Sequence, residues 1–169
     1  MSALTVLYII LPFPLAFIIH DTEEIIFQHK WMLRHKESLL QRFPKAKTMI
    51  DMLSSLSTKA FAIAAFEELV VILLATAWIL ADGKFAIEIW SALFIAFSFH
   101  LLVHIGQGIM IRGYVPGIVT SILLLPYSYL GMQSIWNYMS ITEIILYGLI
   151  GIVFMVINLR FAHWLGLKA

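Results

Sequence analysis

Five long apolar runs restrict the fold of this chain more than any other feature. They extend over Leu4–Phe27, Lys59–Ala81, Phe85–Ile111, Pro116–Met132 and Ile141–Phe161. Each run is close to the length of about 20 residues that a helix needs to cross a hydrocarbon core roughly 30 Å thick. Only 12% of the 169 residues are charged, against about 25% in ordinary soluble domains. We therefore expect an all-α protein, a polytopic transmembrane helix bundle of about five spans that forms a single membrane domain over residues 1–169.

The distribution of Lys and Arg predicts the orientation of these spans. Seven of the eleven basic residues lie between the first two runs or at the start of the second, namely Lys30, Arg34, Lys36, Arg42, Lys45, Lys47 and Lys59. Because cytoplasmic loops carry an excess of Lys and Arg, we expect the N-terminus outside and the C-terminus in the cytoplasm. That orientation leaves Lys84 as the one basic residue outside. It is typical of a multi-pass protein in the cytoplasmic (inner) membrane of a prokaryote.

Residues 29–58 form the predicted loop between the first two spans, and here basic side chains alternate with apolar ones. This pattern is typical of a basic amphipathic cytoplasmic segment that lies on the anionic inner leaflet, with Pro44 dividing it. A solvated connector that packs its apolar residues on the bundle fits the pattern equally well. The net charge of +1 gives no general attraction for nucleic acid, so the expected partner is the lipid bilayer. The sequence indicates no oligomeric state.

Ionisable residues inside the predicted spans require an explanation. They are His20, Asp21, Glu23, Glu24, Glu67, Glu68, His100 and His104. A charged carboxylate near the middle of a bilayer costs about 2.5–3.5 kcal/mol on the translocon scale. No Lys or Arg lies deep in a span to compensate this cost. We therefore expect bound cations or protons to balance these carboxylates.

The spacing of these residues favours a metal site. His20 and Glu24 are four residues apart, as are His100 and His104, so each pair shares one face of its helix. At 1.5 Å per residue, the polar positions of three spans fall roughly 10–12 Å from the same side of the membrane. The chain has no cysteine, so a metal must be held by imidazoles and carboxylates. The expected cofactor is a divalent metal, zinc or iron, as one or two ions.

The predicted metal ligands are His20, Glu24, Glu67, His100 and His104. Adjacent residues on a helix point about 100° apart, so only one of Glu67 and Glu68 is expected to reach the ion, and Glu67 is preferred. Glu23 and Glu68 are the predicted general bases, and Tyr114 is expected to donate a hydrogen bond to the substrate or to a metal-bound oxygen. Any single carboxylate has an alternative role, protonated and hydrogen-bonded to a neighbouring helix. Asp21 is expected to point away from His20 and Glu24.

The sequence resembles the family of small bacterial and archaeal membrane proteins named for an HxxEE motif. The resemblance rests on His20–Glu24, the pair Glu67 and Glu68, the histidine-containing helix with His104, and the turn Tyr114–Gly117. These pieces occur in the expected order over roughly the first 120 residues. The third span of the family carries NxxxH, whereas this chain has His100 at the position of the asparagine. The resemblance implies metal binding, without naming a reaction.

Three functions are compatible with these residues. The first is a membrane-embedded metal-dependent enzyme, either a hydrolase with one zinc ion or an oxidoreductase with two iron ions, that acts on a lipid or a membrane peptide. The second is a transporter or channel for metal ions or protons that uses the same residues as a relay. The third is a structural membrane subunit whose polar cluster fixes helix packing. The outer halves of the spans offer almost no ionisable residue to complete a path, which favours the enzyme.

Overall fold

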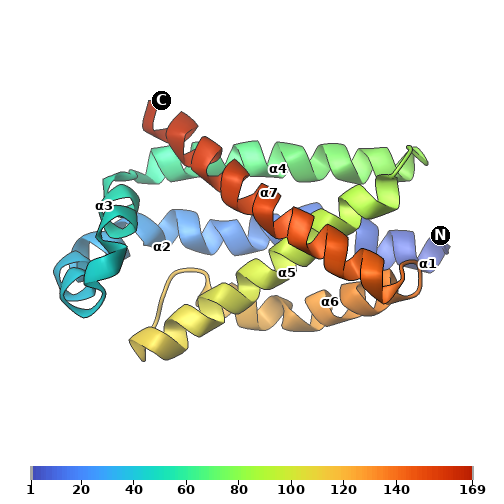
Figure 1. The fold of residues 1–169 in the computed structure, drawn as a ribbon. Helices are drawn as coiled ribbons and strands as arrows, with labels where there is room; N and C mark the ends of the chain where they lie inside the picture. The colour runs from blue at the N-terminus through green and yellow to red at the C-terminus, as the bar shows by residue number, and fades with distance from the viewer. Residues whose placement is uncertain (1, 169) are drawn as a thin grey trace.

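The computed structural model describes residues 2–168, and the described part is helical without strands (Figure 1). The helices are α1 (Ala3–Thr5), α2 (Phe13–Arg42), α3 (Lys47–Ser55), α4 (Thr58–Leu80), α5 (Ala86–Ile111), α6 (Ile118–Trp136) and α7 (Ile141–Lys168). A π-helical turn, Val6–Ile10, joins α1 to α2, and a 3₁₀ turn, Pro44–Ala46, precedes α3. The stretch Ala3–Arg42 and the helices α4, α5, α6 and α7 are long and apolar enough to cross a membrane. The expected five-span helical architecture is therefore confirmed at this level.

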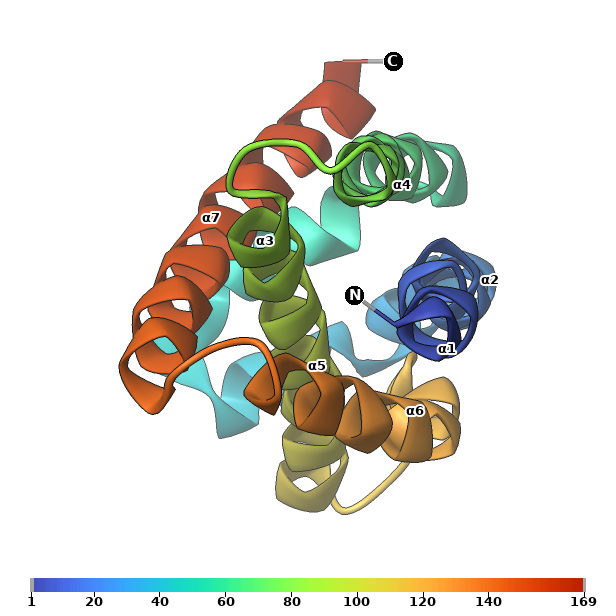
Figure 2. The ribbon, with the colours of Figure 1, turned by 90° about the vertical axis from the view of Figure 1, so that its right-hand side faces the viewer.

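Helix α5 lies in the middle of the bundle, as the view along the helices shows (Figure 2). It packs against α4, α6 and α7, while α2 packs against α4 and α6. Helix α7 crosses its neighbours closely because small residues lie at the contacts. A Cβ atom at Gly151 would come 2.0 Å from the carbonyl oxygen of Ala92, and one at Gly166 would come 2.1 Å from that of Ala60. Such small residues let helix backbones approach each other inside a membrane.

One half of the bundle has a core of packed aromatic rings. Phe13 on α2 is fully buried, and its ring centroid lies 5.4 Å from that of Trp90 and 5.2 Å from that of Phe94. Phe97 extends the cluster, with its centroid 5.4 Å from that of Phe13. Edge-on rings of this kind fill space densely, and they stabilise the fold by more than the buried area alone accounts for. This aromatic core closes the interior on the side of the N-terminus.

Four helix ends differ from the bounds of the predicted spans. The first span was expected to end at Phe27, but α2 continues to Arg42, because no helix-breaking residue comes before Pro44. The fourth was expected over Pro116–Met132, but α6 begins at Ile118, after Gly117 adopts a left-handed conformation with φ of 87°, and ends at Trp136. The fifth was expected to end at Phe161, whereas α7 continues to Lys168.

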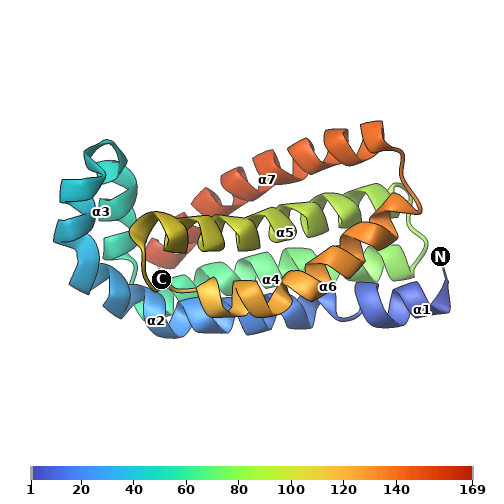
Figure 3. The ribbon, with the colours of Figure 1, turned by 90° about the horizontal axis from the view of Figure 1, so that it is seen from below.

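Residues 29–58 comprise the last turns of α2, the 3₁₀ turn and α3. Figure 3 shows the end of α2 and α3 side by side at one end of the bundle, turned across the axes of α4 and α5. Asp51 on α3 pairs with Lys36 on α2 at 2.9 Å and also with Lys47. Its hydrogen bonds to Lys47 and Lys36 lower the pKa of Asp51. These contacts join α3 to α2.

Candidate metal centre

Four potential ligands converge in the interior between α2 and α5. They are His20 and Glu24 from α2, and His100 and His104 from α5. One ligand atom from each residue lies within 4.8 Å of all the others. His20, Glu24 and His104 are buried, and the side chain of His100 is 24% exposed. The four-residue spacing on each helix therefore places two ligands on the inner face of each helix, as the sequence predicts.

The Glu24 carboxylate lies at the centre of this group. Its oxygen atoms are 3.4 Å from Nε2 of His104, 3.6 Å from Nε2 of His100 and 3.8 Å from Nε2 of His20. The Nε2 atoms of His100 and His104 are 3.0 Å apart. Ligands bound at about 2.0–2.1 Å from a tetrahedral ion lie roughly 3.3 Å from one another. The observed separations match that value closely enough for one ion to fit with small side-chain movements.

Thr120 of α6 orients the imidazole of His20. Nδ1 of His20 lies 3.0 Å from the Thr120 hydroxyl oxygen. That hydroxyl donates its proton to Oε2 of Glu23 at 2.6 Å, so it accepts from Nδ1–H of His20. The proton of a neutral His20 is then on Nδ1, which leaves the lone pair of Nε2 facing the other ligands. Nε2 of His20 is buried and has no hydrogen-bond partner, as expected of an atom placed to bind a metal.

Replacing Thr120 by Val should weaken metal binding by about 10–100-fold, because partners that orient ligating histidines contribute this much to affinity. Thr120→Ser retains the hydroxyl and is expected to stay close to wild type. Equilibrium competition with a chelator dye measures both affinities. Equal affinities of the Val and Ser variants would show that Thr120 does not orient His20.

Glu23 caps the first turn of α6 from a neighbouring helix. Its Oε1 accepts hydrogen bonds from the Tyr114 hydroxyl at 3.0 Å and from the backbone N–H of Val119 at 3.4 Å. Its Oε2 accepts from the backbone N–H of Thr120 at 2.8 Å, as well as from the Thr120 hydroxyl. The N-cap position of α6 is Gly117, which has no side chain to supply these acceptors. Glu23 therefore satisfies N–H groups that a helix start leaves unpaired and places a negative charge at its positive end.

Tyr114 and Gly117 connect the turn before α6 to the metal ligands. Partial burial, together with the hydrogen bond to Glu23, raises the pKa of Tyr114, so its hydroxyl keeps its proton and acts as a donor. Gly117 lies against the His104 ring, where an added Cβ would come 2.8 Å from Nδ1. Because Gly117 also has a positive φ, a larger residue would be strained and would displace His104.

A cavity of about 80 Å³ adjoins two of the four candidate ligands, Glu24 and His100. Its polar lining consists of Asp21, Glu24, Glu68, His100, Asn158 and His163. Its apolar lining includes Phe17, Phe61 and Phe97. A cavity of this size has room for water beside its polar side chains. It also places two further carboxyl groups, those of Asp21 and Glu68, near Glu24 and His100.

The structure does not bring Glu67 into the group, although Glu67 was the preferred ligand of the pair. Oε2 of Glu67 instead accepts a hydrogen bond from Nδ2 of Asn158 on α7 at 3.0 Å. Glu68 lines the cavity beside Glu24. The rotation of α4 about its axis determines which of the two glutamates faces Glu24. Because α4 is apolar on almost every side, its sequence does not indicate that rotation. Asp21 was expected to point away from His20 and Glu24, but it is buried and lines the same cavity as Glu24.

Tyr114 does not reach the four-ligand group with its hydroxyl, which donates to Glu23. Sequence reasoning missed Thr120 as a partner of His20, and it missed His163, which is buried at 4% exposure and lines the cavity. A lone threonine 100 residues beyond His20 carries no local signal. His163 is likewise far along the sequence from Glu24, Glu68 and His100, which line the same cavity, so no local pattern predicts its place there.

The comparisons with known proteins agree with the motif. Residues 11–131 match the family described as proteins of unknown function with an HXXEE motif. No curated protein and no solved structure matches the chain. The matched region contains all four converging ligands, Glu23 and Thr120. Because it covers more than half of the sequence, the chain belongs to the HXXEE family.

Proposed function

We propose that the protein is a membrane-embedded, metal-dependent hydrolase with one divalent ion, preferably zinc. His20, His100, His104 and Glu24 would hold the ion. Three imidazoles and one carboxylate suit zinc, which takes nitrogen and oxygen ligands. A single group of four ligands supports one ion rather than two, and thus hydrolysis rather than di-iron chemistry. The observation that carries the proposal is the cavity that Glu24 and His100 share with the carboxyl groups of Asp21 and Glu68.

Residues around the cavity supply the remaining parts of a hydrolytic site. When bound by these four residues, zinc would accept a water as a fifth ligand and lower the pKa of that water to about 7. Glu68, on the cavity wall, would take the proton of the attacking water and pass it to the leaving group. Both oxygens of Glu23 already accept hydrogen bonds, so Glu23 would position α6 rather than act as a base. Tyr114 would support the same network through Glu23.

The proposed substrate is a lipid or membrane peptide that reaches the site from the basic end of the bundle. The excess of Lys and Arg from Lys30 to Lys59 supports a cytoplasmic location for this end and an extracytoplasmic N-terminus. Such a protein would act in the inner membrane of a prokaryote. The aromatic core around Phe13 and Phe94 lies on the other side of the site. A packed core there disfavours an ion pathway through the bundle.

Glu68→Gln should reduce hydrolysis by about 100-fold or more while bound zinc is unchanged, because a general base contributes about 10²–10⁴-fold to a rate. The assay uses tag-free, zinc-loaded protein in vesicles of phosphatidylethanolamine and phosphatidylglycerol that contain a single-span peptide, with products detected by mass spectrometry. Glu67→Gln is the matched control, since Glu67 does not line the cavity and an amide oxygen can still accept the hydrogen bond of Asn158. Equal rates for both variants, or no product from wild type, would contradict the proposal.

A further inference from the structure

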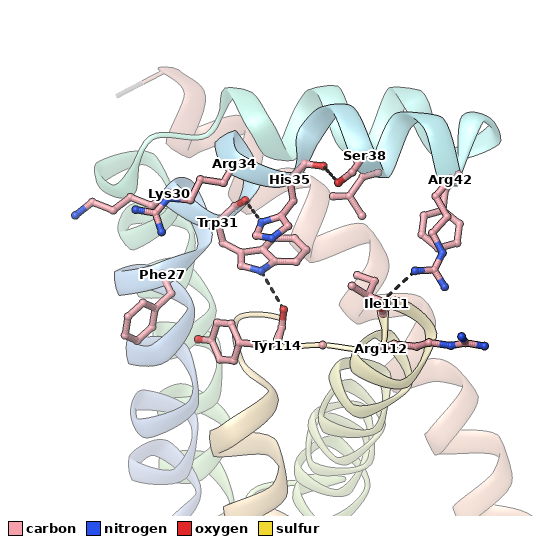
Figure 4. Close-up of a pocket in the computed structure, with 13 residues that line it drawn as sticks. Phe27, Lys30, Trp31, Arg34, His35, Ser38, Arg42, Ile111, Arg112 and Tyr114 are labelled. Atoms are coloured by element: carbon pink, nitrogen blue, oxygen red, sulfur yellow. Dashed lines mark hydrogen bonds between the residues drawn. The ribbon is translucent and has the colours of Figure 1, made fainter.

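A second, larger cavity lies at the basic end of the bundle, outside the metal centre. It is a groove of about 800 Å³ between the last turns of α2 and the end of α5 with the turn that follows (Figure 4). Four cationic residues line it, namely Lys30, Arg34, Arg42 and Arg112. No Asp or Glu is among its lining residues in the described chain. The groove therefore has the charge to bind an anion.

Most of this positive charge is not used inside the protein. The side chains of Lys30, Arg34 and Arg112 make no hydrogen bond or ion pair within residues 2–168, and all three are exposed. Figure 4 shows Lys30 and Arg34 at one end of the groove, and Arg42 and Arg112 at the other. Arg42 alone has a structural role, since its guanidinium donates to the carbonyl oxygens of Met110 and Ile111 at the end of α5.

Fixed contacts across the groove hold its walls in place. Nε1 of Trp31 donates to the carbonyl oxygen of Tyr114 at 3.0 Å, which joins α2 to the turn after α5. The His35 ring stacks on Trp31 with centroids 4.5 Å apart. Together with the bonds of Arg42, these contacts link both walls at two places. An anion would therefore enter a groove that is already formed, without the cost of ordering it.

Along α2, the groove has an apolar residue next to the membrane span and cationic residues beyond it, which is the order found at a membrane interface. Phe27, on the side of the apolar span, is 47% exposed and contacts the Tyr114 ring. Lys30 and Arg34 follow one and two turns later on α2. Aromatic rings at the level of the headgroups and cations just beyond them are typical of surfaces that contact anionic lipid. We propose that this groove binds the headgroup phosphate of an anionic phospholipid.

The test measures lipid binding to the full-length protein in detergent by native mass spectrometry. Phosphatidylglycerol and phosphatidylcholine are each titrated into wild type and the Arg34→Gln/Arg112→Gln variant. We expect wild type to prefer phosphatidylglycerol by at least about tenfold, and the variant to lose most of that preference. The control, Lys45→Gln/Arg160→Gln, removes the same charge from exposed residues outside the groove and should retain the preference.

Two results would overturn the groove as the binding site. One is an equal affinity of wild type for the two lipids. The other is an equal loss in the groove and control variants, which would indicate attraction by total charge alone. Lys30→Gln/Arg34→Gln is a second groove variant that leaves the turn after α5 unchanged. Zinc content is measured in every sample, so a failure of the metal centre is distinguished from a failure of the groove.

Discussion

Glu24→Gln and His104→Ala should each lower the metal bound by the purified protein at least about tenfold, because loss of a ligand costs more than loss of a partner that only orients one. Glu24 lies within 3.4–3.8 Å of all three imidazole Nε2 atoms. Its substitution would remove the one carboxylate among the four candidate ligands. Inductively coupled plasma mass spectrometry on tag-free protein, normalised to protein concentration, measures the loss.

Glu67→Gln is the matched control for this experiment. It makes the same chemical change in a span, and an amide oxygen can still accept the hydrogen bond of Asn158. Its metal content should equal that of wild type. Full occupancy in both ligand variants would exclude the four-residue group as the metal centre.

Glu23→Ala is expected to destabilise the fold by about 2 kcal/mol or more, since hydrogen bonds to a charged group contribute about 1.5–3 kcal/mol each. The substitution leaves the N–H groups of Val119 and Thr120 without their acceptor at the start of α6. For a chain of this length, such a change lowers the unfolding temperature by roughly 4–8 °C. Differential scanning fluorimetry in detergent measures the shift.

Metal binding should weaken in the same variant, because the Thr120 hydroxyl that holds His20 loses its own acceptor. Glu37→Ala is the control, since Glu37 is an exposed glutamate on the same helix. It should change neither property. Unchanged stability of Glu23→Ala would mean that Glu23 does not hold α2 against α6.

The two glutamates of the HxxEE motif therefore have different surroundings. Glu24 faces the imidazoles of α5, whereas Glu23 faces the start of α6. The side chains of adjacent helical residues point about 100° apart, so adjacent residues of one helix can contact two different neighbouring helices at the same depth in the bundle. In this chain the two carboxylates of the motif therefore contact different helices. Tyr114 has an indirect connection to the candidate metal centre through Glu23.

The sequence predicts those parts of the site that depend on local helix geometry. His20 with Glu24 and His100 with His104 follow from spacing within single helices, and the structure brings all four together. The choice between Glu67 and Glu68 depends on the rotation of α4, which an almost uniformly apolar helix does not reveal. The lengths of the apolar runs predict five spans. They do not predict that α2 extends to Arg42, since polar residues continue a helix as readily as apolar ones.

The contacts of Thr120 could not be predicted from the sequence, for a different reason. Its partners His20 and Glu23 come from a helix about 100 residues earlier, and the contact depends on α6 packing beside α2. The groove could also be predicted only in part from the sequence. Residues 29–58 show a basic amphipathic pattern, but Arg112 and Tyr114 join its lining through the tertiary fold.

X-ray absorption at the zinc K-edge tests the central claim most directly. Tag-free protein is loaded with zinc, freed of excess metal and measured in detergent. The four-residue group predicts one tightly bound ion with nitrogen and oxygen ligands at about 2.0–2.1 Å and a scattering pattern that requires three imidazoles. A protein that retains no zinc, or a bound ion with fewer than two imidazoles, would contradict the proposed centre.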